Sequence, residues 1–506
     1  MAYASRSSVM AFVPEVTEGT PVDPAADNFT VVREGASISG AMNTVTSDEL
    51  RNSIGASKAF ATSQAPTGSV PKYFKPSGVE GQAPDYGILI KSCLGSETEN
   101  ATEYTTAAAS TAGTATAAAK IKVNAGVEAN FALGQAVLVK DGTNGYAVRN
   151  ITAKASGELT SSFNFGTAPG AGVGLGKAVL YAPSDVSQPT YTAHWYQSAA
   201  AASGVHLAMA GCRTTSMNIE FVANELASAA FEIGGLSFYQ NPITITASSK
   251  YIDFTDSSGT VACQLTEKTY SSPMDLANEI AAKMTAASVD TISCSFSNST
   301  GKFTISSDGS TLSLLWNSGA NTANSAKTKL GFSNTNDTGS LTYTSDTAQS
   351  YAPSVTPAYD DQAPQVVRYN MLQLGSFSDY LCAGGSSLSI SIGTPKTDIP
   401  NWCAENGLDE SVVLSREVTI SATLKFEKHH VQNFYNLINN AETQLSFVHG
   451  QRTAGNWVPG TIVSVFCPTI SLTASTIADQ DGYLVVQIEG TAFVGNDLQD
   501  VYINFL

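Results

Sequence analysis

Apolar and polar residues alternate along many short stretches of the chain, and Gly, Ser, Thr and Asn interrupt these stretches at short intervals. The alternation is clearest over residues 418–426, and it recurs over residues 388–392, 216–221 and 302–306. A two-residue period predicts strands that bury one face and leave the other face in water. We therefore predict a mainly β protein with a few short helices.

Helical signals are fewer but well defined. Ser272 is a suitable N-cap, Pro273 follows at the first helical position, and apolar residues then recur at i, i+4 spacing. Two shorter segments, residues 85–94 and 430–439, have the pattern of short amphipathic helices. The sequence thus predicts one long helix and two short ones.

Composition changes sharply in two stretches, which we interpret as small inserted β-rich modules. The first, residues 104–188, opens with a tract of Ala, Thr and Ser over residues 105–119, which predicts a flexible connector. The second, residues 241–364, contains the long helix and a predicted hairpin that turns at residues 299–301. We expect an α+β module there.

An internal repeat becomes visible when both modules are set aside. Residues 212–238 and 467–493 match without a gap at an offset of 255 positions, which predicts a duplicated hairpin. Its predicted core consists of Cys212, Met217, Ile233 and Phe238 in one copy and Cys467, Leu472, Ile488 and Phe493 in the other. The first unit then comprises residues 1–103 and 189–240, and the second comprises residues 365–506. The shared Ser and Thr content of strand-rich sequences is the alternative explanation.

Charge is scarce and predominantly negative. The 506 residues include 26 Lys+Arg and 43 Asp+Glu, a net charge of −17, and only 14% of residues are charged. Nucleic-acid binding requires clustered Lys and Arg, so this composition argues against it. A low charge content instead favours a surface covered by neighbouring subunits. The sequence has neither a continuous apolar span nor a signal-peptide core, so we expect cytoplasmic synthesis without membrane insertion.

Patterns for catalysis or metal binding are weak. The seven cysteines include no C-x-x-C pair, and the adjacent His429 and His430 lack the i, i+4 spacing of zinc ligands. The glycine run at residues 170–176 does not match a phosphate-binding loop. We predict no disulfide framework, no metal, no cofactor and no enzymatic activity.

Three features together resemble a known family. They are the opening residues 12–21 (FVPEVTEGTP), the order strand, polar loop, strand, helix and hairpin in both copies, and the closing residues 490–493 (GTAF). This pattern resembles the tail tube protein (major tail protein) of long-tailed, non-contractile bacteriophages. Residues 270–346 are similar to a decoration module of phage structural proteins.

The resemblance implies a structural virion protein. In that family, six tube folds form a flat ring, their sheets join edge to edge into an inner β-barrel, and stacked rings form the conduit for DNA ejection. Two folds per chain imply homotrimeric rings with pseudo-hexameric symmetry. The implied partners are other copies of the chain, a tape measure protein, a tail terminator and tail-tip proteins. We expect assembly in the host bacterial cytoplasm and a final location in the virion tail, where an acidic lumen passes viral DNA without binding it.

Two long polar segments, residues 41–62 and 393–416, are predicted to be loops that stack one ring on the next. Their candidate stacking residues are Asp48, Glu49, Arg51, Asp398, Glu405, Asp409, Glu410 and Arg416. The inserted modules are expected to point outward from the tube. The alternative function is a bacterial or phage surface adhesin, a multi-domain β protein that binds host glycans.

Overall fold

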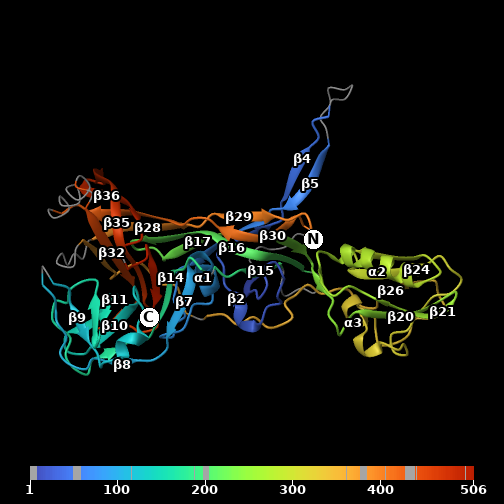
Figure 1. The fold of residues 1–506 in the computed structure, drawn as a ribbon, viewed down its shortest axis with the longest axis horizontal. Helices are drawn as coiled ribbons and strands as arrows, with labels where there is room; N and C mark the ends of the chain where they lie inside the picture. The colour runs from blue at the N-terminus through green and yellow to red at the C-terminus, as the bar shows by residue number, and fades with distance from the viewer. Residues whose placement is uncertain are drawn as a thin grey trace.

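The structure is a computed structural model. It describes every residue except 1–7, 50–57, 115–116, 187, 198–203, 361, 376–383, 405, 428–438, 440 and 496. Strands dominate, as the alternation predicts, and the described α-helices are α1 (Gly87–Leu94), α2 (Pro273–Ala287) and α3 (Lys327–Leu330). The predicted helix at residues 430–439 lies almost entirely outside the described residues. Figure 1 shows a central β body with one small module below its left end and another at its right end.

The first half of the body is a set of antiparallel strands. They pair in the order β2 (Phe29–Thr30), β1 (Val9–Pro14), β15 (Tyr191–Gln197), β16 (Val205–Val222), β17 (Ser228–Gly234), β6 (Thr67–Tyr73) and β3 (Ser37–Ser39). Strand β16 is 18 residues long, so its two ends have different partners. Its first part pairs with β15, and its last part pairs with β17.

The second half repeats this order of pairing. The strands are β27 (Met371–Gly375), β32 (Glu442–His449), β35 (Val463–Gln480), β36 (Tyr483–Ala492), β31 (Glu417–Lys425) and β28 (Gly385–Gly393). Strand β28 also pairs with the last part of β16 and so joins the halves. One continuous run of eight strands results, in the order β3-β6-β17-β16-β28-β31-β36-β35.

One hydrophobic core serves both halves. Alternate residues of β16, including Met217, Ile219 and Phe221, are buried in it, and α1 adds its apolar face. Phe221 of the first half lies 4.4 Å from Phe447 of the second, measured between ring centroids. The halves therefore form a single packed body.

The first inserted module is a six-stranded sheet with its own small core. Its strands are β8 (Tyr104–Thr105), β9 (Lys120–Lys122), β10 (Ala136–Asp141), β11 (Gly145–Ala155), β12 (Glu158–Ser161) and β13 (Gly174–Leu175). The low-complexity tract is not the flexible connector that its composition predicts, because Thr106 and Ser110 are buried and Thr111 pairs with Lys120. The module also packs against the second half, where Asn504 accepts a hydrogen bond from the backbone of Ala136.

The predicted end of this module at residue 188 lies too far along the chain. Strand β14 (Ala178–Pro183) pairs with β7 (Gly95–Asn100) and with the C-terminal strand β37 (Tyr502–Phe505), so it belongs to the main sheet. The alternating pattern of β14 is the same in either location. Only its tertiary partners assign it to the body.

The second inserted module has a separate core around the fully buried Trp316. Helix α2 begins as predicted, with the backbone N–H of Asp275 donating to Ser272 Oγ at 3.2 Å. The predicted hairpin forms between β23 (Ile292–Ser297) and β24 (Lys302–Ser307). The remaining strands are β19 (Ile243–Thr244), β20 (Tyr251–Asp256), β21 (Gly259–Gln264), β22 (Thr269–Tyr270), β25 (Ser313–Leu314) and β26 (Thr342–Thr344).

The two halves match each other, but not at the predicted offset of 255. Strands β16 and β35 each contain two register shifts, at equivalent places. Cys212 pairs with Tyr191 next to the first shift in β16, and Ile470 pairs with Thr443 next to the first shift in β35. These two residues are 258 positions apart. Cys212 and Cys467 are therefore not equivalent by pairing. A β-bulge shifts register by one residue without any sequence signal, and the shared alternation of Ser, Thr and apolar residues tolerates the error.

The residues of the predicted hairpin core have mixed exposure. Cys212, Met217, Ile233, Cys467, Leu472 and Ile488 are buried, Phe238 is half-buried, and Phe493 is 36% exposed. The turn between β35 and β36 is formed by Asp481 and Gly482, both with positive φ.

The two long polar segments are β-hairpins, not loops. In the first half the hairpin is β4 (Met42–Thr46) with β5 (Ala59–Gln64), and in the second it is β29 (Lys396–Pro400) with β30 (Leu408–Val413). Their registers agree at one offset, since Val45 pairs with Phe60 and, 352 positions later, Thr397 pairs with Val412. Ile38 and Ile390, in the strands that precede the hairpins, have the same offset.

Candidate assembly interface

The eight-stranded run ends on two open edges. Residues 474–480 of β35 pair with β36 on one side and with no described strand on the other. At the opposite end, β3 pairs with β6 alone among the described strands. Unpaired backbone N–H and C=O groups make such edges templates for strand addition.

The junction inside the chain shows how two such edges fit together. Where β16 meets β28, Ile219 lies opposite Ile390, and both side chains are fully buried. Position 477 on β35 corresponds to position 219 on β16, because the irregularities of the two strands lie 258 positions apart. Ile477 is 56% exposed. Among the described residues, the second half therefore has no strand in the position that β28 occupies beside β16 in the first half.

The face of the run that points away from the core is lined by small hydroxyl groups and acids. Its residues include Ser69, Ser216, Asn218, Ser389, Ser391, Thr419, Ser421, Thr423 and Thr491, with the acids Glu220, Glu232, Glu417 and Glu489 and one base, Lys425. Some of these side chains bond to one another: Ser389 donates to Asn218 at 3.1 Å and Ser69 donates to Glu232 at 2.8 Å. The face is polar and net negative.

The hairpin β29–β30 of the second half is held against the first half. Lys396 Nζ donates to the carbonyl of Gly235 at 3.0 Å, and Arg213 Nε donates to Ser411 Oγ at 2.8 Å. Asn406 Nδ2 donates to the carbonyl of Leu236 at 3.2 Å. The contact therefore fixes the hairpin of one half across the surface of the other.

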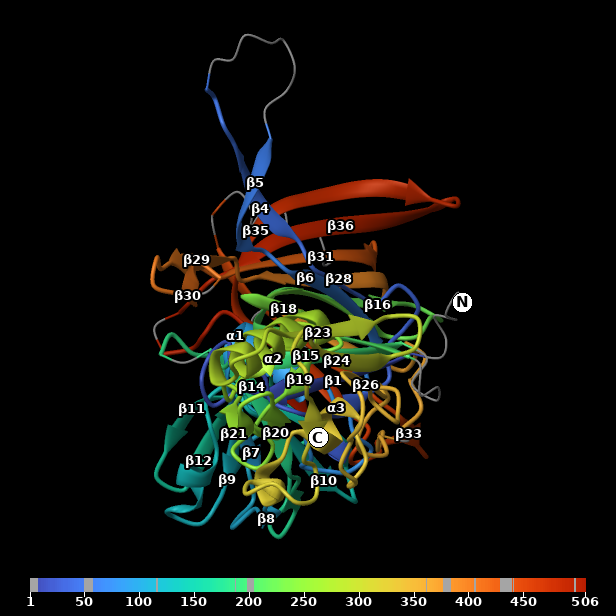
Figure 2. The same ribbon diagram turned by 90° about the vertical axis from the view of Figure 1, so that its right-hand side faces the viewer.

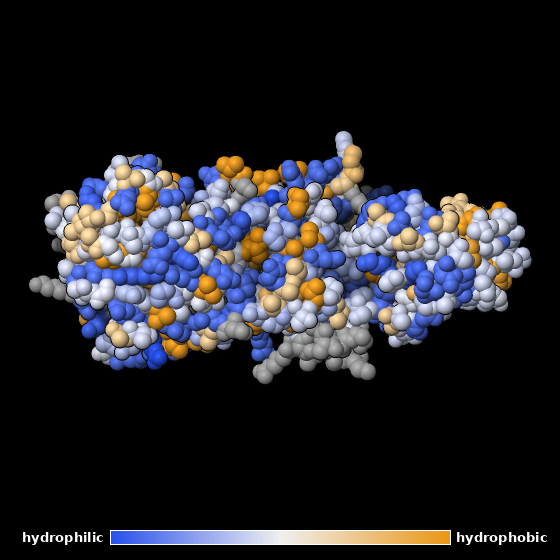
Figure 3. Space-filling model, turned by 90° about the horizontal axis from the view of Figure 1, so that it is seen from below, coloured by the Kyte–Doolittle hydropathy of each residue, from blue (hydrophilic) through white to orange (hydrophobic). Residues whose placement is uncertain are grey.

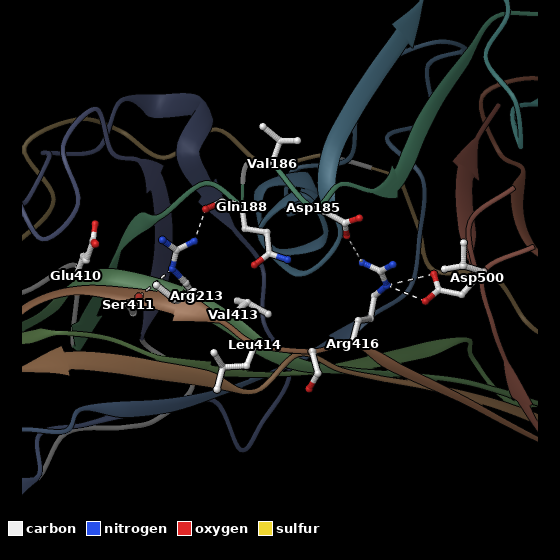
Figure 4. Close-up of a pocket in the computed structure, with 13 residues that line it drawn as sticks. Asp185, Val186, Gln188, Arg213, Glu410, Ser411, Val413, Leu414, Arg416 and Asp500 are labelled. Carbon is white, nitrogen blue, oxygen red and sulfur yellow. Dashed lines mark hydrogen bonds and ion pairs between the residues drawn. The ribbon is translucent and has the colours of Figure 1, made fainter. Parts of the chain in front are cut away.

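A polar cleft of about 670 Å³ lies beside this contact (Figure 4). Two arginines line it: Arg213 forms an ion pair with Glu18 at 2.9 Å, and Arg416 forms one with Asp500 at 2.8 Å. Figure 4 shows Arg416 between Asp500 and Asp185, with its guanidinium group directed away from the strands. Because both positive charges are compensated within the chain, the cleft offers no free positive charge to an anion.

The predicted stacking residues are thus divided between different environments. Asp48 and Glu49 are exposed beyond β4, and Asp409 and Glu410 are exposed on β30. Asp398 forms an ion pair with Lys396 at 2.5 Å, and Arg416 is mostly buried by its own ion pair. Arg51 and Glu405 lie outside the described residues. The six described residues do not share one surface.

The hairpin β4–β5 projects from the body (Figures 1 and 2). Its large apolar side chains are exposed: Met42 is 51% exposed, Val45 58% and Phe60 48%. On the face seen in Figure 3, by contrast, apolar residues are scattered in small groups among hydrophilic ones.

Hydrophobic alternation does not predict these hairpins, but the sequence contains another signal for them. Residues 36–74 and 388–426 match without a gap at the offset of 352. The shared residues of the first segment are Ser37, Ile38, Ser39, Gly55, Ser63, Thr67, Ser69 and Phe74. A comparison at that offset predicts two equivalent hairpins between equivalent strands.

Within the described residues, no helix has the length and apolarity needed to cross a bilayer. No group of three or more His, Cys, Asp or Glu in the described part of the chain is arranged to hold a metal ion. Comparison with known proteins gives no match to a family model and none to a curated protein.

Proposed function

We propose that the chain is a structural subunit that polymerises with copies of itself into stacked rings, forming a hollow tube of the phage tail-tube kind. The observation that carries the proposal is the junction between β16 and β28. At the ends of the eight-stranded run, β35 has an open edge equivalent to that of β16, and β3 has one equivalent to that of β28. The order of pairing, repeated strand by strand, supports a duplicated unit. A chain of two such units has one internal junction and needs one more for each neighbour.

The register of β16 with β28, applied to the equivalent strands β35 and β3, defines the proposed contact between chains. Ile477 of one chain would lie opposite Ile38 of the next, as Ile219 lies opposite Ile390. Ser39 would lie opposite Thr476. Covering the exposed part of Ile477 would contribute on the order of 1 kcal/mol per junction, in addition to the new backbone hydrogen bonds. A head-to-tail contact of this kind closes into a ring when its rotation closes.

The number of chains follows from the resemblance to the tube family, in which six units form a ring. Two units per chain then give a ring of three chains with pseudo-sixfold symmetry. A reconstruction with six chains per ring would contradict the duplicated-unit proposal.

The polar face of the sheet would line the lumen. The opposite face packs on the hydrophobic core, so the face with Glu220, Glu232, Glu417 and Glu489 is the one free to meet a conduit. Hydroxyl groups and carboxylates present no array of cations to hold phosphates, and a negative wall repels them. DNA would therefore slide through without binding. A tape measure protein, a tail terminator and tail-tip proteins are the partners proposed at the tube ends.

Electron microscopy of the purified, concentrated chain tests the function. Rings or hollow tubes with threefold features are expected. Separate particles that stay monomeric at high concentration, also after incubation with preformed tube ends, would contradict the proposal and favour the adhesin alternative.

A further inference from the structure

The hairpin β4–β5, which we call the arm, has apolar residues on its surface and no covering partner in the described chain. Val45 and Phe60 face each other across its two strands and are 58% and 48% exposed. Asn43 Nδ2 of one strand donates to Ser63 Oγ of the other at 2.9 Å, so this hydrogen bond stays within the arm. Exposed apolar side chains grouped on one element indicate a contact surface.

The equivalent hairpin β29–β30 shows where such an element docks. It follows β28, which pairs with β16, and it then lies on residues 213–215 and 235–237 of the first half. Lys396 reaches the carbonyl of Gly235, Ser411 bonds to Arg213, and Thr394 donates to the carbonyl of Thr214 at 2.9 Å. The docking surface lies directly beyond the end of the strand junction.

Each residue in this contact has an equivalent in the other half, which the strand registers identify. On the arm, Thr44 corresponds to Lys396 and Ala59 corresponds to Ser411, both at 352 positions. On the receiving side, residues 213–215 correspond to 471–473, and residues 235–237 correspond to 492–494. Phe493 and Val494 are 36% and 56% exposed there.

We propose that the arm of one chain docks on residues 471–473 and 492–494 of a neighbouring copy in the same ring. The inference rests on the proposed function, because it places the arm by means of the junction between chains. Strand β3 ends at Ser39 and the arm begins at Met42, so pairing of β3 with a neighbour's β35 brings the base of the arm to that surface. Met42 of the arm is 51% exposed in the single chain, and Phe493 and Val494 of the receiving surface are 36% and 56% exposed. Met42 corresponds to Thr394, which is fully buried in the contact between the halves, so docking covers it. The arm thus binds a neighbour within the same ring. From the sequence alone, residues 41–62 are instead predicted to form a contact between rings.

Disulfide trapping tests the contact directly. In a background with Cys382 and Cys403 replaced by serine, the pair Ala59→Cys and Ser471→Cys is expected to link neighbouring chains under oxidation. Non-reducing gels should then show covalent dimers and trimers. The pair Ala59→Cys and Ser421→Cys, which places the second cysteine on the polar face, is the matched control and should stay monomeric.

A second pair, Ser39→Cys and Thr476→Cys, reports on the strand junction alone. Links at this pair without links at the arm pair would overturn the arm inference and leave the proposed function intact. Absence of links at both pairs in assembled rings would overturn both.

A variant without new cysteines provides an independent measurement. Met42→Ser should raise the concentration at which rings dissociate at least tenfold, and the melting temperature of the single chain should not change, because Met42 is 51% exposed and lies outside the hydrophobic cores of the described residues. Rings as stable as those of the unaltered chain would contradict the docking.

Discussion

Ile219 and Ile477 occupy equivalent positions on the two long strands of the body, yet Ile219 is fully buried and Ile477 is 56% exposed. The difference arises because β28 covers one side of β16, while no described strand covers the same side of β35. An apolar residue left exposed where its counterpart is buried indicates a missing neighbour. The neighbour proposed above is strand β3 of another copy of the chain.

Ile477→Lys should prevent ring formation without unfolding the chain. A lysine beside the incoming strand would place an unpaired charge in an apolar contact, whereas in the single chain it would remain in water. Light scattering coupled to size exclusion should show monomers only, and circular dichroism should be unchanged. Val289→Lys is the matched control, because Val289 is 71% exposed on the second module. Normal rings from the Ile477 variant would exclude this edge as the contact.

Charge reversal of the polar face should create affinity for DNA. Replacement of Glu220, Glu232, Glu417 and Glu489 by lysine exchanges four negative charges for four positive ones on a face that otherwise carries mostly hydroxyl groups. Assembled rings of this variant should retain short duplex DNA at low salt and release it as salt rises, since counterion release governs such binding. Fluorescence anisotropy of labelled DNA measures this effect. The unaltered rings should not bind, and equal binding by both would remove this face from the lumen.

The second module should fold alone. Its core, which spans Ile243 to Phe332, contains helix α2 and the buried Trp316 and is separate from the core of the body. A fragment of residues 241–350 should show cooperative unfolding, with blue-shifted fluorescence from Trp316, the module's single tryptophan. Exposed tryptophan emission from the fragment would show that the module needs the body.

Acidification should weaken the body through two stacked histidines. His194 Nδ1 lies 2.9 Å from His206 Nε2, and burial lowers the pKa of both side chains below the ordinary value. Nearby Asp23 opposes the shift at His194 only in part. Because the unfolded chain takes up protons that the folded chain excludes, stability is complete above about pH 6.5 and falls as pH decreases.

Below about pH 6.5 the free energy of unfolding should fall as pH decreases, by at most about 1.4 kcal/mol per pH unit for each histidine. Urea unfolding at several pH values measures it. The double variant His194→Gln/His206→Gln should lose this part of the pH dependence, whereas His449, whose burial lowers its pKa to about 4, remains as an internal reference. If the free energy of unfolding of the double variant depended on pH as steeply as that of the unaltered chain, the histidine pair would not be the cause of the pH dependence.

Removing a buried cation should destabilise the first half. Lys72 Nζ lies 3.0 Å from Asp85 Oδ1, and the two side chains are 1% and 5% exposed. Lys72→Met should cost about 3–5 kcal/mol, because it leaves the Asp85 carboxylate buried without its partner. The double variant Lys72→Met/Asp85→Leu should recover most of the loss in urea unfolding. A single variant as costly as the double would mean that packing, and not charge, governs the site.

Local signals predicted the elements whose interactions lie close in sequence. Helix α2 depends on Ser272, Pro273 and an apolar stripe, and all of these lie within one segment. The strands β31, β28 and β24 follow from alternation for the same reason. The hairpin β4–β5 escaped prediction because its outward residues are mixed in polarity, so no alternation marked it.

The sequence by itself determined the strand-rich class, the capped helix, the presence of two modules and a repeat within the chain. These depend on patterns that short segments contain. Only the tertiary structure decided the register of the repeat, because bulges in β16 and β35 change it without a sequence mark. It alone also decided which edges stay open, which acids share the polar face and that Arg416 is paired within the chain. These relationships depend on contacts between residues hundreds of positions apart, and such contacts exist only when the chain has packed.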